Sequence, residues 1–139
     1  MPDYQICHVV PSVDDYIRIR LESGLSLKSQ QAATVGLRNG LFSVVAYWGE
    51  IPVGIGRIIG DGGCFFQIVD IAVVPEHQKK GLGDLIMRSL MAWIHANCPP
   101  TAYVSLMAHH GTPEFYKRYG FVATELPQST GMYIRIPLE

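Results

Sequence analysis

The sequence predicts an α/β fold built as a single domain over residues 1–139, with elements in the order βααβββαβαββ. Short apolar, strand-like runs separated by turn residues recur along the chain, and the run from Ile68 to Val74 leads into a glycine-bearing loop. An amphipathic helix is expected after this loop, because apolar residues recur there at helical spacing: Leu82, Leu85, Ile86, Leu90, Trp93 and Ile94. A chain of 139 residues with 48% hydrophobic content can bury one well-filled core.

The first half of the chain is predicted to hold a strand, two helices and a hairpin. Their expected bounds are a strand at 4–10, helices at 13–21 and 29–38, and hairpin strands at 41–48 and 51–59. Ser12 is the expected N-cap of the first helix, because its hydroxyl can accept from a backbone N–H of the first turn. Asn39-Gly40 ends the second helix, and Gly49-Glu50 supplies the hairpin turn.

The second half is predicted to alternate strands with helices. Its expected elements are a strand at 64–74, a helix at 81–97, a strand at 103–107, a short helix from 113 through 116, and strands at 121–125 and 132–137. Pro99-Pro100 follows the long helix, which therefore has to end before them. The short helix has Thr112 as N-cap, Pro113 at its first position and Gly120 just beyond its end.

Residues 78–83, with the sequence Gln-Lys-Lys-Gly-Leu-Gly, form the loop that opens the long helix. Backbone N–H groups at a helix start are unpaired and lie at the positive end of the helix dipole, so they can bind a phosphate. Gly81 and Gly83 have no Cβ that would keep a ligand away, and Lys79 and Lys80 add positive charge. The loop is therefore predicted to bind an anionic group.

The spacing of the loop excludes two common nucleotide-binding motifs. A dinucleotide fingerprint needs a glycine or alanine at position 86, where Ile86 stands. A nucleoside-triphosphate loop needs four residues between its glycines and then Gly-Lys-Ser/Thr, a run that the sequence does not contain.

Two pieces of the sequence resemble the GNAT family of N-acetyltransferases. Residues 69–73, Pro75 and residues 78–83 resemble the family's acetyl-coenzyme-A-binding strand and its Arg/Gln-x-x-Gly-x-Gly/Ala turn. Downstream, residues 115–121 resemble the family's Phe/Leu-Tyr-x-x-x-Gly-Phe segment. The pieces are closest to glucosamine-phosphate and arylalkylamine-type small-molecule acetyltransferases. The resemblance implies the GNAT fold, a mixed and mostly antiparallel sheet whose fourth and fifth strands splay apart to receive acetyl-coenzyme A as a co-substrate.

The resemblance also implies a set of site residues. The backbone of Ile71 and Val73 is expected to bind the pantetheine amides, and the Ile71 N–H is expected to stabilise the acetyl oxygen in the transition state. Tyr116 is the expected general acid, which protonates the departing thiolate. The full cofactor-binding set is Ile71, Ala72, Val73, Gln78, Lys79, Lys80, Gly81, Leu82, Gly83, Asp84, His109 and Tyr116. His109 replaces an asparagine that often contacts the coenzyme in this family.

The general base is left open. In arylalkylamine acetyltransferases histidines stand at the places of Gln67 and Val69, and in the glucosamine-phosphate enzymes a carboxylate would be matched by Met107. The remaining candidates are His109, His110, Asp70 and an ordered water held by Gln67. Strand alternation predicts that Asp70 faces away from Gln67 and Val69.

Composition and charge exclude several other classes of protein. A net charge of −1 without a basic run argues against a nucleic-acid binder or an anionic-membrane binder. Apolar runs are too short to span a bilayer and no signal segment is seen, so a cytoplasmic protein is expected. Three widely spaced cysteines predict buried free thiols, and with the histidines scattered no metal site is expected.

Three functions remain in view. The leading one is acetyl transfer from acetyl-coenzyme A to a primary amine of a small molecule, by direct attack when both substrates are bound. A protein lysine or N-terminal acetyltransferase is the second, and it would need an open groove at residues 22–32. A non-catalytic acyl-coenzyme-A-binding module is the third, and Tyr116 argues against it. The resemblance also allows a homodimer.

Overall fold

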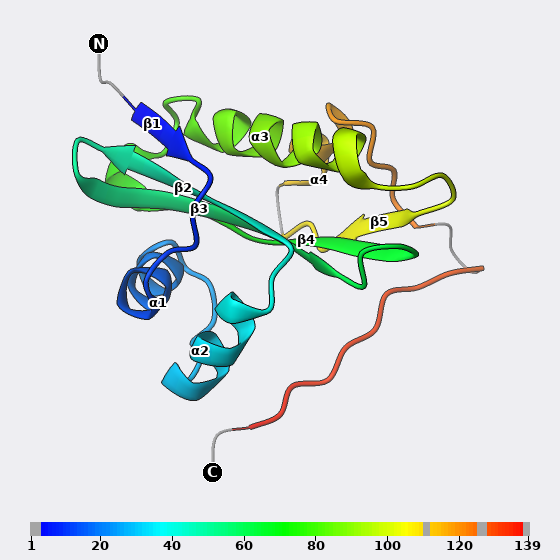
Figure 1. The fold of residues 1–139 in the computed structure, drawn as a ribbon, viewed down its shortest axis with the longest axis horizontal. Helices are drawn as coiled ribbons and strands as arrows, with labels where there is room; N and C mark the ends of the chain where they lie inside the picture. Colours follow the sequence, from blue (N-terminus) through cyan, green and yellow to red (C-terminus); the bar gives the residue numbers. More distant parts are fainter. Residues whose placement is uncertain (1–3, 110–111, 125–127, 138–139) are drawn as a thin grey trace. The chain divides into compact units, whose positions relative to one another are not determined.

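The computed structural model describes residues 4–109, 112–124 and 128–137. The chain divides into two compact units, Met1–Met107 and Ala108–Glu139, which are described separately. The elements of the first unit, drawn in Figure 1, are β1 (Tyr4–Cys7), α1 (Val13–Glu22), α2 (Gln30–Arg38), β2 (Phe42–Trp48), β3 (Ile51–Gly60), β4 (Phe65–Val73), the 3₁₀ helix η1 (Pro75–His77), α3 (Leu82–Asn97) and β5 (Tyr103–Leu106). The second unit contains the helix α4 (Pro113–Lys117).

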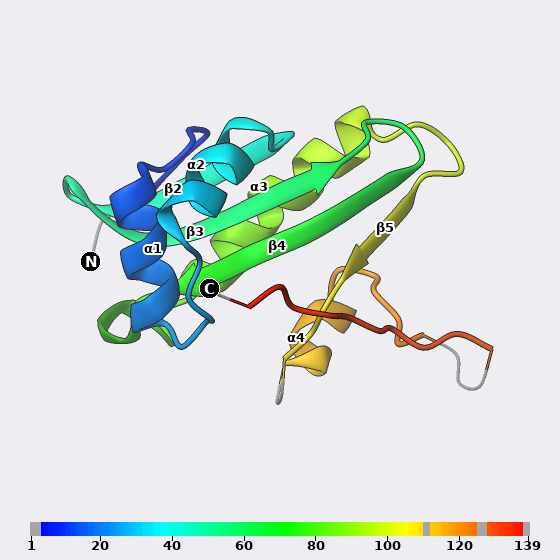
Figure 2. The same ribbon diagram turned by 90° about the horizontal axis from the view of Figure 1, so that it is seen from below.

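The first unit is one mixed sheet between two layers of helix. Its strands lie in the order β1-β2-β3-β4-β5, antiparallel from β1 to β4 and parallel between β4 and β5. The helix α3 packs on one face of the sheet, and α1 with α2 lies on the other (Figure 1). Figure 2 shows β3, β4 and β5 side by side. The loop between β4 and α3 therefore connects the sheet to the helix that covers it.

Helix α3 lies unusually close to β3, and glycines make this approach possible. A Cβ at Gly56 would lie 2.6 Å from Ile86 Cγ2, and one at Gly54 would lie 3.1 Å from Ile86 Cδ1. Ile86 and Leu90 are fully buried by this contact. Apolar burial of this kind contributes about 25 cal/mol per Å², so the seam between α3 and β3 is a main part of the core.

Local sequence signals predicted the helices of the first unit correctly. Ser12 caps α1, its Oγ accepting from Asp15 N at 3.1 Å, and Ser29 caps α2 in the same way at 3.1 Å from Ala32 N. The α/β fold class and the element order are confirmed as far as α4. The first strand is shorter than predicted, because it ends at Cys7 where its pairing with β2 ends.

The two strands predicted at 121–125 and 132–137 are not seen in the described residues 121–124 and 128–137. A strand needs a neighbour for its N–H and C=O groups, and no such pairing is found for these described residues. The apolar side chains that alternate along the second range, Met132, Ile134 and Ile136, are between 84% and 89% exposed. The apolar alternation thus predicted strands, but the described residues of both ranges have no strand partner.

Candidate functional site

One edge of β4 loses its neighbour halfway along the strand. Pairing with β5 runs only from Phe65↔Tyr103 to Ile68↔Leu106, whereas β4 continues to Val73. On the other edge β4 remains paired with β3 as far as Val73. The β5 side of residues 69–73 therefore has no strand partner within the described part of the first unit, which is the splay that the resemblance predicted.

A β-bulge interrupts β4 at this point. Between the pairs Arg57↔Val69 and Ile55↔Ala72, β3 advances by two residues and β4 by three. The extra residue coincides with Asp70, whose φ of 60° lies in the left-handed region that side chains rarely adopt. Such a bulge shifts the alternation of the strand by one residue.

The bulge decides which backbone groups face the open edge. Beyond it, the Val74 N–H donates to the Val53 carbonyl of the β3 side at 2.9 Å. Successive residues of a strand direct their backbone groups to opposite edges. The backbone groups of Ile71 and Val73 therefore point away from β3, toward the unpaired edge.

An unbroken strand would point Ile71 the other way. Before the bulge, the Phe65 carbonyl accepts from Asp61 N on the β3 side at 3.1 Å, so odd-numbered residues face β3 there. Continued without interruption, this alternation would turn the Ile71 N–H into the β3 ladder. The extra residue at Asp70 is thus what directs Ile71 to the open edge.

The bulge also overturns the predicted orientation of Asp70. Phe66 lies against Trp93 of α3, with ring centroids 6.1 Å apart, which places Gln67 and Val69 on the opposite face. Asp70 lies on that same face, because its Oδ2 accepts from the Tyr16 hydroxyl of α1 at 2.8 Å. The prediction that Asp70 faces away from Gln67 and Val69 is wrong, since it assumed an unbroken strand.

Asp70 is the centre of a buried cluster that the sequence analysis missed. Arg57 Nε donates to Asp70 Oδ2 at 2.9 Å and Arg20 Nη1 donates to Oδ1, and the three side chains are only 6–8% exposed. Arg20 also donates to the Ser26 carbonyl at 3.1 and 2.8 Å, and Arg57 Nη1 to the Gly36 carbonyl at 3.1 Å. The sequence signal for this cluster was that Arg20 and Arg57 stand among apolar residues of α1 and β3, because buried charges are normally paired.

The third donor of this cluster, Tyr16, is kept protonated. Burial, and next the nearby charge of Asp70, raise the pKa of the Tyr16 phenol to about 12. With three side chains donating to its two oxygens, Asp70 acts as a structural acceptor. Nothing in this arrangement leaves it free to take a proton from a substrate.

The loop between β4 and α3 contains two residues with left-handed backbone conformations. Gly81 is the N-cap of α3 with a left-handed φ of 82° and no side-chain cap, and Lys79 has a φ of 62°. A Cβ at Gly81 would meet nothing within 4 Å, so the loop faces open space there. Alternation of left- and right-handed residues ahead of a helix forms a concave group of N–H donors suited to anions.

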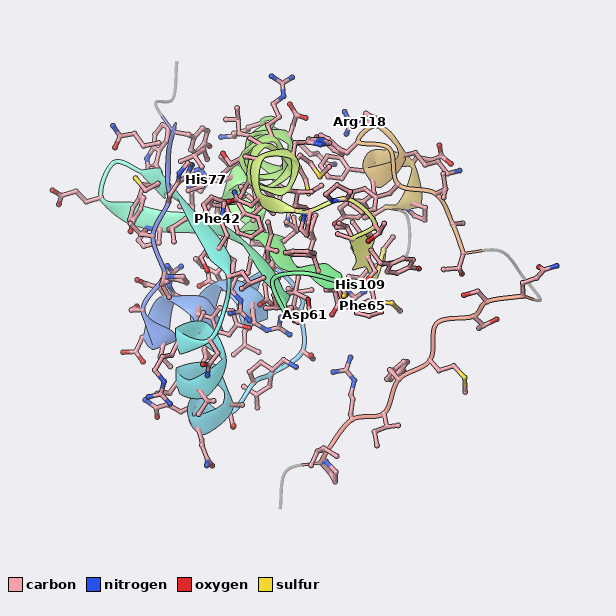
Figure 3. The ribbon with its side chains drawn as sticks, turned by 45° about the vertical axis from the view of Figure 1, so that its right-hand side comes forward. Phe42, Asp61, Phe65, His77, His109 and Arg118 are labelled. Carbon is pink, nitrogen blue, oxygen red and sulfur yellow. The ribbon has the colours of Figure 1, made fainter. Side chains whose placement is uncertain are left out.

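Two side chains fix this loop to the sheet. Gln78 Nε2 donates to the carbonyl of Val73, the last residue of β4, at 2.8 Å. His77 Nδ1 is 2.7 Å from the Tyr4 hydroxyl of β1, and its ring lies 5.5 Å from that of Trp48. Figure 3 labels His77 at this end of β4 and Asp61 with Phe65 at the other. The loop is therefore anchored at its first residues and open at Gly81.

The other predicted cofactor-binding residues of the first unit differ in how far their side chains are exposed. Ala72 is 4% and Leu82 is 1% exposed, so their side chains belong to the core. Asp84, in the first turn of α3, forms an ion pair with Arg88 at 2.9 Å. Lys80 is exposed beside the loop. Contact of these residues with a coenzyme stays a prediction.

Tyr116 and His109 belong to the second unit. The Tyr116 ring packs edge-on against Phe115, with centroids 5.1 Å apart, and burial raises the pKa of its phenol. Phe115 also contacts Tyr119, with ring centroids 5.5 Å apart. His109 is exposed, and His110 lies outside the described residues. The roles of these residues remain predictions.

Cysteines and metal ligands give no competing site in the described residues. The three cysteines are free, but the prediction that they are buried is wrong: Cys64 is exposed at the tip of the turn before β4, and Cys7 and Cys98 are partly exposed. Within the described ranges no group of three His, Cys, Asp or Glu side chains could hold a metal ion. None of the helices described combines the length and apolar character needed to cross a membrane.

Known structures resemble this chain over almost its whole length. A probable acetyltransferase of unknown function from meticillin-resistant Staphylococcus aureus is 41% identical with a TM-score of 0.91, covering 96% of this chain and 100% of its own. A GNAT-family acetyltransferase from Streptococcus pneumoniae is 23% identical with a TM-score of 0.79, covering 99% and 100%. The glucosamine-6-phosphate N-acetyltransferase of Arabidopsis thaliana is 13% identical with a TM-score of 0.68, covering 96% and 99%. The last two likenesses show the fold alone.

A search of curated proteins found no match. The family model of the acetyltransferase (GNAT) domain matches residues 25–136, which is most of the chain and includes β4, the loop and α4. With this match and the 41% identical structure, the chain belongs to the GNAT acetyltransferase family.

Proposed function

We propose that this protein transfers an acetyl group from acetyl-coenzyme A to a primary amine of a small molecule, with both substrates bound at once. The observation that carries the proposal is the unpaired edge of β4, which leads directly into the open glycine loop of α3. A pantetheine arm carries amides that can pair with such an edge, and a pyrophosphate suits the loop. The open edge and the loop therefore suit the pantetheine arm and the pyrophosphate of the co-substrate.

Backbone groups would hold the co-substrate along β4. The outward groups of Ile71 and Val73 can pair with the pantetheine amides. The Val73 carbonyl already accepts from Gln78 at 2.8 Å, but a carbonyl oxygen has a second lone pair. Main-chain recognition explains why the segment can be built from apolar residues.

The Ile71 N–H would serve as the donor for the developing oxyanion. When the amine nitrogen bonds to the thioester carbon, the carbonyl oxygen becomes negative and accepts from this N–H. A preorganised donor of this kind contributes about 3 kcal/mol to the transition state. Much of the remaining acceleration comes from holding amine and thioester in line.

Proton transfers complete the reaction. The ammonium form of the acceptor first loses a proton to a base, for which a water held by Gln67, His109 or His110 remains a candidate. Collapse of the tetrahedral intermediate breaks the C–S bond, Tyr116 protonates the departing thiolate, and the nitrogen gives up its remaining extra proton, which restores the Tyr116 phenol. Burial keeps the Tyr116 phenol in its protonated form, which this role requires.

An acceptor screen tests the proposal. Free thiol release from acetyl-coenzyme A is measured with a panel of small primary amines, with lysine-containing and free-N-terminal peptides, and without acceptor. We expect small amines to raise release above the hydrolysis rate and peptides not to do so. Release with peptides alone would assign the protein to the lysine or N-terminal acetyltransferases. Tight binding of acetyl-coenzyme A without transfer to any acceptor would indicate a non-catalytic module.

A further inference from the structure

We propose that Asp70 is a positioning residue for this reaction: it locks the bulge of β4 and so keeps the Ile71 N–H directed at the acetyl group. The inference rests on the proposed function, because it concerns the donor that the transfer uses. It assigns a role to a buried charge cluster that does not itself touch the reacting atoms. The cluster consists of Tyr16, Arg20, Arg57 and Asp70.

The conformation of Asp70 needs support from its surroundings. Its φ of 60° is unfavourable for any residue with a Cβ, although aspartate tolerates it better than most. Three donors from two elements hold the side chain: Tyr16 and Arg20 of α1, and Arg57 of β3. Because side chain and backbone belong to the same residue, fixing the carboxylate fixes the bulge.

The alternative position of the strand would remove the oxyanion donor. If the extra residue moved out of the bulge, the alternation before Asp70 would continue and Ile71 would pair toward β3. Its N–H would then no longer reach the open edge. Contacts made on one face of the sheet thus control a backbone group at its edge.

The same cluster connects the bulge with the segment between α1 and α2. Arg20 bonds to Asp70 and also to the carbonyl of Ser26, within residues 22–32, where a protein acetyltransferase would need an open groove. Arg57 bonds to Asp70 and also to the carbonyl of Gly36 in α2. One carboxylate therefore sets the position of two parts of the chain: residues 69–73 of β4 and the segment between α1 and α2.

The bonds between Asp70 and the two arginines depend on the charge of its carboxylate, so a substitution that removes the charge and keeps the shape should disrupt them. Asp70 is the single carboxylate found bonded to both guanidinium groups among the described residues. Asp70→Asn retains the volume but leaves two buried cations beside a neutral amide. Their mutual repulsion should displace the bulge and spread the arginines apart. The glycine loop, at the other end of this segment, keeps its own anchors at His77 and Gln78.

The test compares Asp70→Asn with Ile19→Val, a control in the same helix as Tyr16 and Arg20. Ile19 is fully buried, so its truncation lowers stability without removing any bond to Asp70. Acetyl-coenzyme A affinity is measured by calorimetry, and acetyl transfer by single turnover with an amine from the screen. We expect Asp70→Asn to slow transfer by roughly 10²-fold, the effect of losing one oxyanion donor, and to weaken acetyl-coenzyme A affinity by a smaller factor, because the Ile71 backbone also pairs with pantetheine. Ile19→Val should keep both values near those of the wild type.

A second readout follows the donor itself. In protein labelled with ¹⁵N-isoleucine, the Ile71 amide resonance, assigned by Ile71→Val, should shift when acetyl-coenzyme A replaces coenzyme A. This shift should be present in Ile19→Val and lost in Asp70→Asn. If Asp70→Asn does not fold, Arg20→Lys takes its place, because lysine keeps the charge but cannot bridge Asp70 and Ser26; a slowing of about tenfold is then expected.

The outcomes separate this inference from the proposed function. A stable Asp70→Asn or Arg20→Lys protein with unchanged transfer and an unchanged Ile71 shift would show that the cluster is only structural. Equal losses of affinity and rate in Asp70→Asn and Ile19→Val would show the same. A wild-type protein that neither binds acetyl-coenzyme A nor transfers acetyl overturns the proposed function, and the positioning role with it.

Discussion

Few side chains of the first unit reach the proposed reaction directly, because backbone groups supply most of the contacts. The outward groups of Ile71 and Val73 and the open turn at Gly81 require particular conformations more than particular side chains. In the proposed mechanism Tyr116, a residue of the second unit, takes part through its side chain, since a phenol has to supply the proton. The proposed chemistry at the residue scale therefore depends on this side chain and on the conformation of Asp70.

Removing only the phenolic oxygen of Tyr116 should separate chemistry from binding. We expect Tyr116→Phe to bind acetyl-coenzyme A nearly as the wild type does, but to turn over roughly 10²-fold more slowly, the low end for general acid catalysis. Single-turnover transfer, with calorimetry on the same protein, measures both. An unaltered rate of the chemical step would remove Tyr116 from the mechanism.

Cysteine variants test direct attack. In the proposed mechanism the amine attacks the thioester itself and no acyl-enzyme is needed, so Cys64→Ser and Cys98→Ser should each retain most of the activity. Cys64 is the stricter case, as it is exposed. An acetylated cysteine trapped in the absence of amine would replace direct transfer with a two-step route.

Alkaline pH should reveal the buried phenol of Tyr16. Its pKa is raised from 10.0 to about 12 in the folded protein, so the protonated form contributes stability fully below pH 10. That stability should be lost as the pH rises through the folded-state pKa of about 12. The denaturation midpoint is followed against pH for the wild type and Tyr16→Phe. If the denaturation midpoints of the two proteins change with pH in parallel, the pKa of Tyr16 is not raised in the folded protein.

Elements that carry their own local signals could be predicted from the sequence, and those that depend on distant partners could not. Ser12 predicted the start of α1, and the periodicity of residues 82–94 predicted α3, because each signal acts within a turn or two. The bulge at Asp70 depends instead on arginines 50 and 13 positions away. No local sequence pattern predicts such a bulge, so the orientation that strand alternation predicted for Asp70 was wrong.

The glycine loop gives the clearest test at the scale of an element. Gly81→Val forces a β-branched residue to a φ of 82°, which costs about 1–2 kcal/mol, and places its side chain where the pyrophosphate is expected. We predict at least a tenfold loss of acetyl-coenzyme A affinity, measured by calorimetry, in a folded protein.

Gly36→Ala is the matched control. It also adds a Cβ that meets nothing within 4 Å, but in the helix α2 and without a left-handed φ. This variant should keep the affinity and gain roughly 0.5–1 kcal/mol of stability. If Gly81→Val also keeps its affinity, the loop does not bind the pyrophosphate.

At the scale of the whole molecule, the sequence motifs predicted the family and the fold class, and both are confirmed. They could not predict the acceptor, because the motifs lie on β4, the loop and α4, which are proposed to bind the co-substrate. Residues 22–32, where a protein acetyltransferase would need an open groove, match neither motif. The single domain predicted over residues 1–139 also stays a prediction, since the structure describes two compact units.

Calorimetric titration of the wild-type protein with acetyl-coenzyme A tests the central claim most directly, because every step proposed above begins with that complex. The account predicts saturable one-to-one binding with a dissociation constant in the micromolar range and a rise in melting temperature in proportion to ligand excess. Absence of binding below the millimolar range would contradict the claim that the open edge of β4 and the loop at residues 78–83 form an acetyl-coenzyme A site.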